Sequence, residues 1–68
     1  MVNLNEMKAA RVRTGQSQAD IAKALNVSLA TYNRYETGKS VMDIDSVLKF
    51  CQACCINDPA ERAYIFLT

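Results

Sequence analysis

The chain has 68 residues, of which half are apolar, with a formal net charge of +1, no histidine and three cysteines. This length permits one small domain with a limited apolar core. There is no run of about 18 apolar residues, and the first residues lack a secretory pattern, so we expect a cytoplasmic protein without a membrane span. With two glycines, one proline and no long polar–apolar alternation, the sequence predicts an all-α fold of five short helices.

The first helix is predicted over residues 5–14. Met7, Ala10 and Arg11 share one of its faces, and Gly15 can end it because glycine tolerates the left-handed backbone.

Two short helices around a tight turn are predicted over residues 17–37. Ser17 and Asp20 have the spacing of a capping box, so the first of these helices begins near residue 18. Asn26 can adopt the left-handed backbone that ends it, and Ser28 can cap the next helix. Two capped helices separated by such a turn predict a helix-turn-helix.

Two further helices are predicted in the second half. Asp43 can cap the first of these helices. Asp58 followed by Pro59 predicts the start of the second helix, over residues 59–67. The first has apolar residues at spacings of three and four that are expected to point inward: Ile44, Val47, Leu48 and Cys51.

Residues 7–67 resemble the DNA-binding domain of the Cro and lambdoid-repressor regulators, the XRE family. Caps, turn and apolar spacing agree together, which makes the resemblance specific. The matching segments are Arg11, Gly15-Gln16-Ser17-Gln18, Ile21-Ala22, Leu25-Asn26-Val27-Ser28 and Glu36-Thr37-Gly38-Lys39. The sequence departs from the family at Gln16, Tyr32 and Tyr35, where apolar residues are usual. The resemblance implies one compact domain over residues 1–68, in a phage or prokaryotic regulator.

The resemblance also implies a set of DNA contacts, because the second helix of this motif enters the major groove while the first crosses the backbone. The base-reading residues would be Leu29, Ala30, Thr31, Asn33 and Arg34. Asparagine suits adenine, arginine suits guanine, and the apolar pair suits thymine methyl groups. Phosphate contacts would come from Ser17, Gln18, Ser28, Thr37, Lys39 and Ser40. Arg11 and Glu36 would form an ion pair that joins the first helix to the end of the recognition helix.

The distribution of charge indicates two kinds of surface. Residues 1–40 carry six basic and three acidic residues, whereas residues 41–68 carry two and four. This division suits a domain that meets phosphates with one face and protein with another, although a mixed solvated surface would give a similar difference. The last helix ends in apolar residues that either fold onto their own domain or, as we expect, form a two-fold dimer contact: Tyr64, Ile65, Phe66 and Leu67.

Cys51, Cys54 and Cys55 would place three sulfur atoms near one helix face, a spacing that could serve a metal. Without histidine or a second cysteine pair, we instead expect Cys51 and Cys54 to be buried as small apolar side chains. Cys55 falls where the family usually has a helix-ending glycine, which predicts a left-handed backbone or a different helix end, and leaves an exposed redox-sensing thiol as an alternative. No metal, cofactor, small-molecule substrate or catalytic constellation is expected.

Two functions are consistent with these features. The leading prediction is a sequence-specific transcriptional regulator, a repressor that binds a palindromic operator on double-stranded DNA as a homodimer. The alternative is a protein-interaction module on the same fold, such as an antitoxin or an anti-repressor partner, which the low net charge and the apolar Leu29-Ala30 pair favour.

Overall fold

The computed structural model describes residues 2–66. Five helices make up this part of the chain, and it contains no strand. They are α1 (Leu4–Arg13), α2 (Gln18–Leu25), α3 (Leu29–Glu36), α4 (Ile44–Ala53) and α5 (Pro59–Phe66). The predicted all-α fold with five helices is therefore confirmed.

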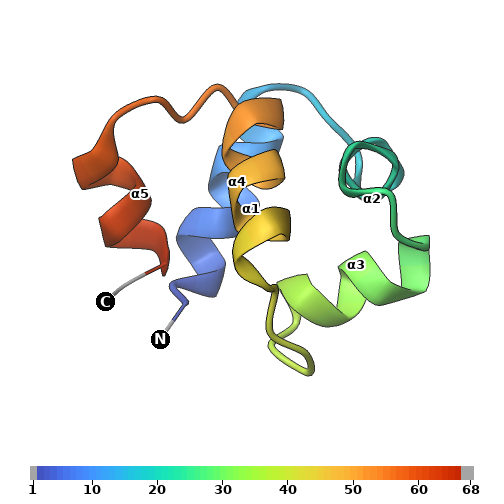
Figure 1. Cartoon of the computed structure of the whole chain (residues 1–68). Helices are drawn as coiled ribbons and strands as arrows, with labels where there is room; N and C mark the ends of the chain where they lie inside the picture. Colours follow the sequence, from blue (N-terminus) through green and yellow to red (C-terminus); the bar gives the residue numbers. More distant parts are fainter. Residues whose placement is uncertain (1, 67–68) are drawn as a thin grey trace.

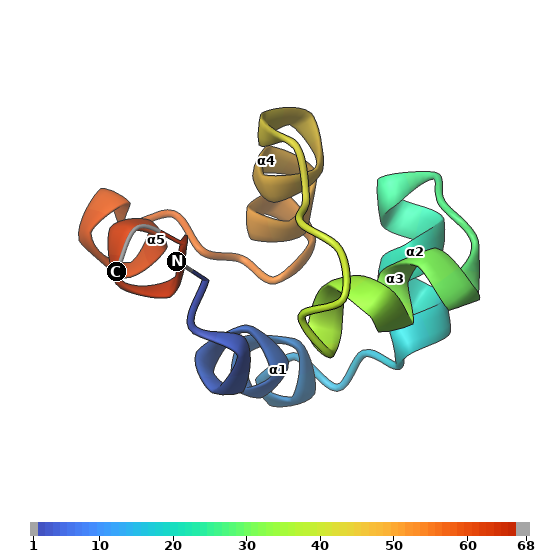
Figure 2. The same ribbon diagram turned by 90° about the horizontal axis from the view of Figure 1, so that it is seen from below.

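The helices surround a single core. In Figure 1, α2 and α3 lie together at one end of the molecule and α5 at the other, with α1 and α4 between them. The turned view of Figure 2 places α1 and α4 on opposite sides. The backbone N–H of Asn3 donates a hydrogen bond of 2.6 Å to the carbonyl of Ile65, which joins the start of α1 to the end of α5.

The helix starts follow the predicted caps. Ser17 and Asp20 form the complete capping box at α2, since each side chain accepts from the other residue's backbone N–H. Ser28 accepts from the N–H of Thr31 at α3, and Asp43 accepts from that of Ser46 at α4. These bonds satisfy N–H groups that have no partner within the helix. Helix α1 begins one residue earlier than predicted.

The predicted helix ends are also present. Asn26 has φ 58° and Cys55 has φ 56°, both in the left-handed region. Cys55 is exposed, whereas Cys51 and Cys54 are buried as expected. Burial raises the pKa of Cys54 to about 11, so this thiol stays protonated and unreactive at neutral pH.

The core is built from all five helices, with α2 packed against both α3 and α4. Phe50 of α4 and Phe66 of α5 meet edge to face, with ring centroids 5.7 Å apart. The largest fully buried side chains are Tyr32, Phe50, Met7, Ile21, Ile65 and Cys54.

The prediction of which α4 residues point inward is wrong in part. Ile44 and Leu48 are exposed, and the helix instead buries Ser46, Phe50 and Cys51. At 3.6 residues per turn, Leu48 lies about 160° from Phe50 and so faces away from the core, whereas Ile44 lies near the buried Cys51 in angle but is exposed in the first turn of the helix. The larger Phe50 side chain, which packs on Phe66, takes the inward position.

The end of α5 also differs from the dimer contact that we expected. Ile65 and Phe66 are buried in the core of their own chain, so this arrangement leaves them no surface for a partner. Tyr64 is exposed, and Leu67 lies outside the described residues. Ile65 and Phe66 therefore fold onto their own domain, which was the alternative. A chain of this length has few residues for its core, and these two side chains add to it.

Candidate nucleic-acid interface

Helix α3 directs most of its predicted base-reading residues to solvent. It is short, and only Tyr32 and Glu36 are buried along it. Their spacing of four places both on one side of the helix, so the opposite side is free. Ala30 and Arg34 are exposed on that opposite side, Asn33 is exposed on its flank, Leu29 is exposed in the first turn, and Thr31 is half-buried.

The orientation of α3 relative to α1 depends on a buried ion pair. The Nε of Arg11 donates to Oε2 of Glu36 at 3.0 Å, and one terminal nitrogen donates to Oε1 at 2.9 Å. The two side chains are only 10% and 4% exposed. The other terminal nitrogen donates to the carbonyl of Gln16 at 2.8 Å, so the guanidinium also fixes the loop between α1 and α2. Arg11 and Glu36 thus form the pair that the family resemblance implied.

The ionisation of Glu36 follows from these contacts. Burial acts to raise its pKa, but the hydrogen bonds that the carboxylate accepts from Arg11 and Gln18 act in the opposite direction, and the pKa is lowered overall. The hydrogen bond to Glu36 in turn raises the pKa of Arg11. Both groups are therefore charged at neutral pH.

Gln18 links this ion pair to the exposed side of α3. Its Nε2 donates to Oε1 of Glu36 at 3.3 Å, and its Oε1 accepts from Nδ2 of Asn33 at 3.3 Å. The side chains of Arg11, Glu36, Gln18 and Asn33 form a continuous hydrogen-bonded chain, which we call the bracing network. The network connects α1, α2 and α3, so the Asn33 amide is oriented before any ligand arrives.

The residues just beyond α3 hold the other end of this surface. The Nε of Arg34 donates to the Ser40 hydroxyl at 3.1 Å, and the Thr37 hydroxyl donates to the carbonyl of Asn33 at 2.9 Å. Lys39 is exposed, and its side chain is in no ion pair within residues 2–66. Gly38 has φ +82°, and a Cβ there would approach a Leu4 methyl carbon to 2.9 Å. Glycine therefore permits the turn that places Lys39 and Ser40 beside α3.

The helix N-termini present the remaining predicted phosphate contacts. Ser17 and Gln18 begin α2, and Ser28 precedes α3. The hydroxyls of Ser17 and Ser28 already accept capping bonds from backbone N–H groups. The first turn of α3 has no acidic residue, so its N-terminus carries partial positive charge that favours a phosphate, whereas the Asp20 carboxylate already lies at the N-terminus of α2.

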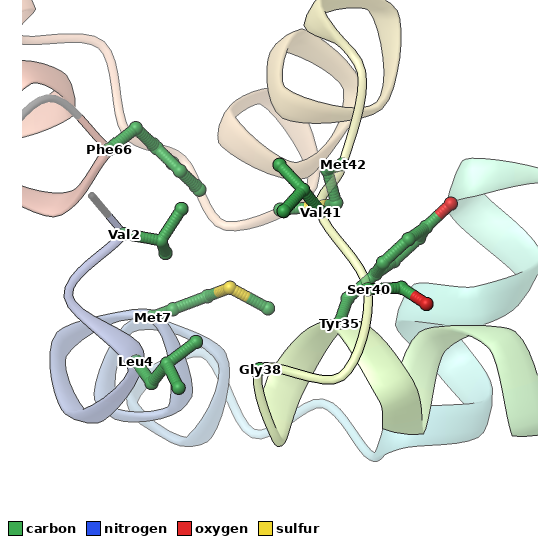
Figure 3. A pocket seen from close by; sticks show the side chains of 9 residues that line it. All are labelled: Val2, Leu4, Met7, Tyr35, Gly38, Ser40, Val41, Met42 and Phe66. Carbon is green, nitrogen blue, oxygen red and sulfur yellow. The ribbon is translucent and has the colours of Figure 1, made fainter.

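Sequence reasoning missed two features near this surface. Gln16, an unexplained departure from the family pattern, donates from Nε2 to the carbonyl of Ala53 at 2.6 Å and so ties the loop before α2 to the end of α4. A cavity of about 380 Å³ also opens where α3 ends. Its lining residues are Val2, Leu4, Met7, Tyr35, Gly38, Ser40, Val41, Met42 and Phe66, shown in Figure 3.

Among residues 2–66, no three histidine, cysteine, aspartate or glutamate side chains lie together in a way that could hold a metal ion. No helix in the same part of the chain is long and apolar enough to cross a membrane.

A family model described as a helix-turn-helix domain matches residues 5–65. No curated protein and no solved structure matches the chain. The matched region includes all of the bracing network and the exposed side of α3, and such domains bind DNA with this pair of helices. The chain belongs to the helix-turn-helix domain family, as a DNA-binding regulator would.

Proposed function

We propose that this chain is a sequence-specific transcriptional repressor of the XRE type, which binds a palindromic operator as a homodimer through the DNA major groove. The observation that carries the proposal is the bracing network, because it fixes an exposed Asn33 on α3 to a buried ion pair. A pre-oriented side chain loses less conformational entropy when it binds a base than a free one does.

Asn33 and Arg34 would provide hydrogen-bond readout. The Asn33 amide can pair with the N6 and N7 edge of adenine. Because Arg34 uses only its Nε in the bond to Ser40, both terminal nitrogens can donate to O6 and N7 of guanine. Each such paired contact is worth about 1–3 kcal/mol of discrimination against the wrong base.

Apolar and phosphate contacts would complete the interface. Leu29, Ala30 and the methyl group of Thr31 suit the methyl group of thymine. Phosphate contacts would fix the register of the domain on the duplex without reading sequence. We assign them to Ser17, Gln18, Ser28, Thr37, Lys39 and Ser40.

A protein-interaction module on the same fold is the second candidate. It is favoured by the exposed Leu29 at the start of α3 and by a net charge of only +1, which is low for a protein that neutralises many phosphates. In this case α3 would contact an apolar protein surface, and neither Arg34 nor Lys39 would be needed.

Binding to a pool of randomised duplexes at two salt concentrations, followed by sequencing of the bound fraction, separates the two candidates. A DNA-reading repressor enriches a palindromic site and loses affinity steeply as salt rises. Arg34→Ala should relax specificity at one base of each half-site, whereas Lys8→Ala, which removes an equal charge from an exposed position on α1, should not. Failure to enrich any sequence at low salt would refute the repressor proposal and favour the protein partner.

A further inference from the structure

Helix α4 and the residues before it carry exposed apolar side chains that the core does not use. Val41, Ile44 and Leu48 are 82%, 71% and 44% exposed. Ile44 and Leu48 lie one helical turn apart on the same side of α4. We call Ile44 and Leu48 the α4 patch, since Val41 precedes the helix and lines the cavity of Figure 3. Single exposed apolar residues are common on proteins, but an apolar row at helical spacing is typical of a contact surface.

The patch lies next to charged residues of opposite sign. Asp45 and Lys49 are both exposed and also one turn apart, so they run alongside Ile44 and Leu48. The ion pairs within residues 2–66 are Arg11–Glu36 and Arg13–Glu61, so Asp45 and Lys49 have no such partner within the described chain.

This arrangement is complementary to itself. When two copies of α4 pack antiparallel about a two-fold axis, Ile44 of each copy approaches Leu48 of the other. The same register brings Asp45 of each copy within reach of Lys49 of the other, so that two ion pairs form at the edge of one apolar contact. A two-fold interface requires a surface that matches itself in this way.

We propose that the α4 patch is the contact between two copies of this chain, with the two α4 helices antiparallel. The charge pattern favours a second copy over an unrelated protein. In an antiparallel pair, Asp45 of one copy finds its partner in Lys49 of the other copy, and Lys49 of the first finds its partner in Asp45 of the second. The contact itself does not require DNA. Its role on a palindromic operator rests on the proposed function.

The position and size of the patch indicate how the dimer would behave. Lys39 and Ser40, which we assign to phosphate contacts, lie in the segment between α3 and α4, so the α4 patch follows the proposed DNA-binding residues in the chain. Helix α4 has only 10 residues and is therefore about 15 Å long. Its contact is smaller than the roughly 1,200–2,000 Å² of stable interfaces, so the dimer should be weak and reversible in solution.

The test is sedimentation of the DNA-free chain up to millimolar concentration, with charge-reversal variants. Asp45→Lys and Lys49→Asp each place like charges opposite one another twice per dimer, and each should weaken self-association about tenfold. The double variant, Asp45→Lys with Lys49→Asp, restores both ion pairs in reversed order and should recover the wild-type dimer. An equimolar mixture of the two single variants should form a heterodimer that is tighter than either homodimer.

Two controls keep the result specific. Circular dichroism should show that every variant is folded, because Asp45 and Lys49 are exposed. Lys8→Asp, a matched charge reversal on α1, should leave self-association unchanged. A wild-type chain that remains monomeric at millimolar concentration would overturn the proposal. So would a dimer that is insensitive to the reversals, or a double variant that does not recover.

Binding to DNA half-sites separates this proposal from the proposed function. Single-reversal variants that keep sequence-specific half-site binding but lose cooperative binding to the full palindrome would support both. The charge-reversal pattern in solution without any sequence-specific DNA binding would support the α4 contact and refute the repressor. Specific DNA binding with the wrong reversal pattern would refute the α4 contact alone.

Discussion

Removing the charge of Glu36 is the sharpest test of how this domain is held together. In Glu36→Gln the side chain keeps its size, but the buried Arg11 guanidinium loses its counter-charge. The substituted amide can accept at one position only, and its NH₂ group would face an Arg11 nitrogen that is itself a donor. Breaking a buried ion pair by removing one partner costs about 3–5 kcal/mol.

That loss is large relative to the stability of the whole domain. A chain of 68 residues is stable by about 3–10 kcal/mol in total. Glu36→Gln should therefore lose a large part of the domain's stability and unfold at a much lower urea concentration than the wild type. Urea denaturation followed by circular dichroism at low temperature and neutral pH measures the difference.

The second ion pair provides a matched control. Arg13 and Glu61 are also joined at 3.0 Å, but their side chains are far more exposed. Glu61→Gln makes the same chemical change in a solvated pair and should cost about 0–1 kcal/mol. Equal losses for Glu36→Gln and Glu61→Gln would refute the argument that burial makes the first pair essential.

A double substitution tests the mechanism of that loss. Arg11→Met combined with Glu36→Leu removes both charges and fills the space with apolar groups. Because no buried charge is left alone, this variant should be more stable than Glu36→Gln. It should nevertheless bind the selected DNA more weakly, since Gln18 would lose its acceptor on α3.

Three further measurements follow from the structure. The pKa of Glu36 is lowered in the folded state. The Glu36 carboxylate therefore contributes fully to stability above its ordinary pKa, and this contribution is lost as the pH falls through the folded-state pKa. The difference in unfolding free energy between wild type and Glu36→Gln should shrink when urea titrations are taken from about pH 7 to about pH 3. Cys55→Gly should raise stability by about 0.5–1 kcal/mol, because glycine adopts φ 56° without strain, while Cys55→Ser should be neutral; an equal change in both variants would refute this reasoning. Gln18→Leu should reduce affinity for the selected DNA by about 1 kcal/mol or more, because it removes both the proposed phosphate contact of Gln18 and its hydrogen bond to the Asn33 amide, and unchanged affinity would refute both roles.

Local features of this fold could be predicted from the sequence because they depend on a few neighbouring residues. The capping box of Ser17 and Asp20 needs only four consecutive residues, and the left-handed end at Asn26 needs one. The exposed residues of α3 were expected from the resemblance to the family rather than from local spacing.

Features that depend on distant partners were predicted less well. Two overlapping sets of apolar residues on α4 have helical spacing, one that contains Ile44 and one that contains Phe50. The spacing alone does not show which of the two sets faces the core. Phe66 makes that choice by packing on Phe50 from a helix beyond the next loop. The bond from Gln16 to the carbonyl of Ala53 likewise joins residues 37 apart in sequence.

Helix α3 carries residues that hold it in the domain and exposed residues that do not, so the two sets should respond differently to substitution. Tyr32 and Glu36 are the only side chains that α3 buries, and one of these is charged. Tyr32 and the partly buried Tyr35 pack α3 on the core, and the paired bonds from Arg11 to Glu36 also fix its orientation and distance relative to α1. A substitution at Glu36 should therefore impair both folding and DNA reading, while Arg34, which is outside the bracing network and exposed, should affect reading alone. The recognition surface can thus change its sequence preference through exposed residues without loss of the contacts that hold α3 in place.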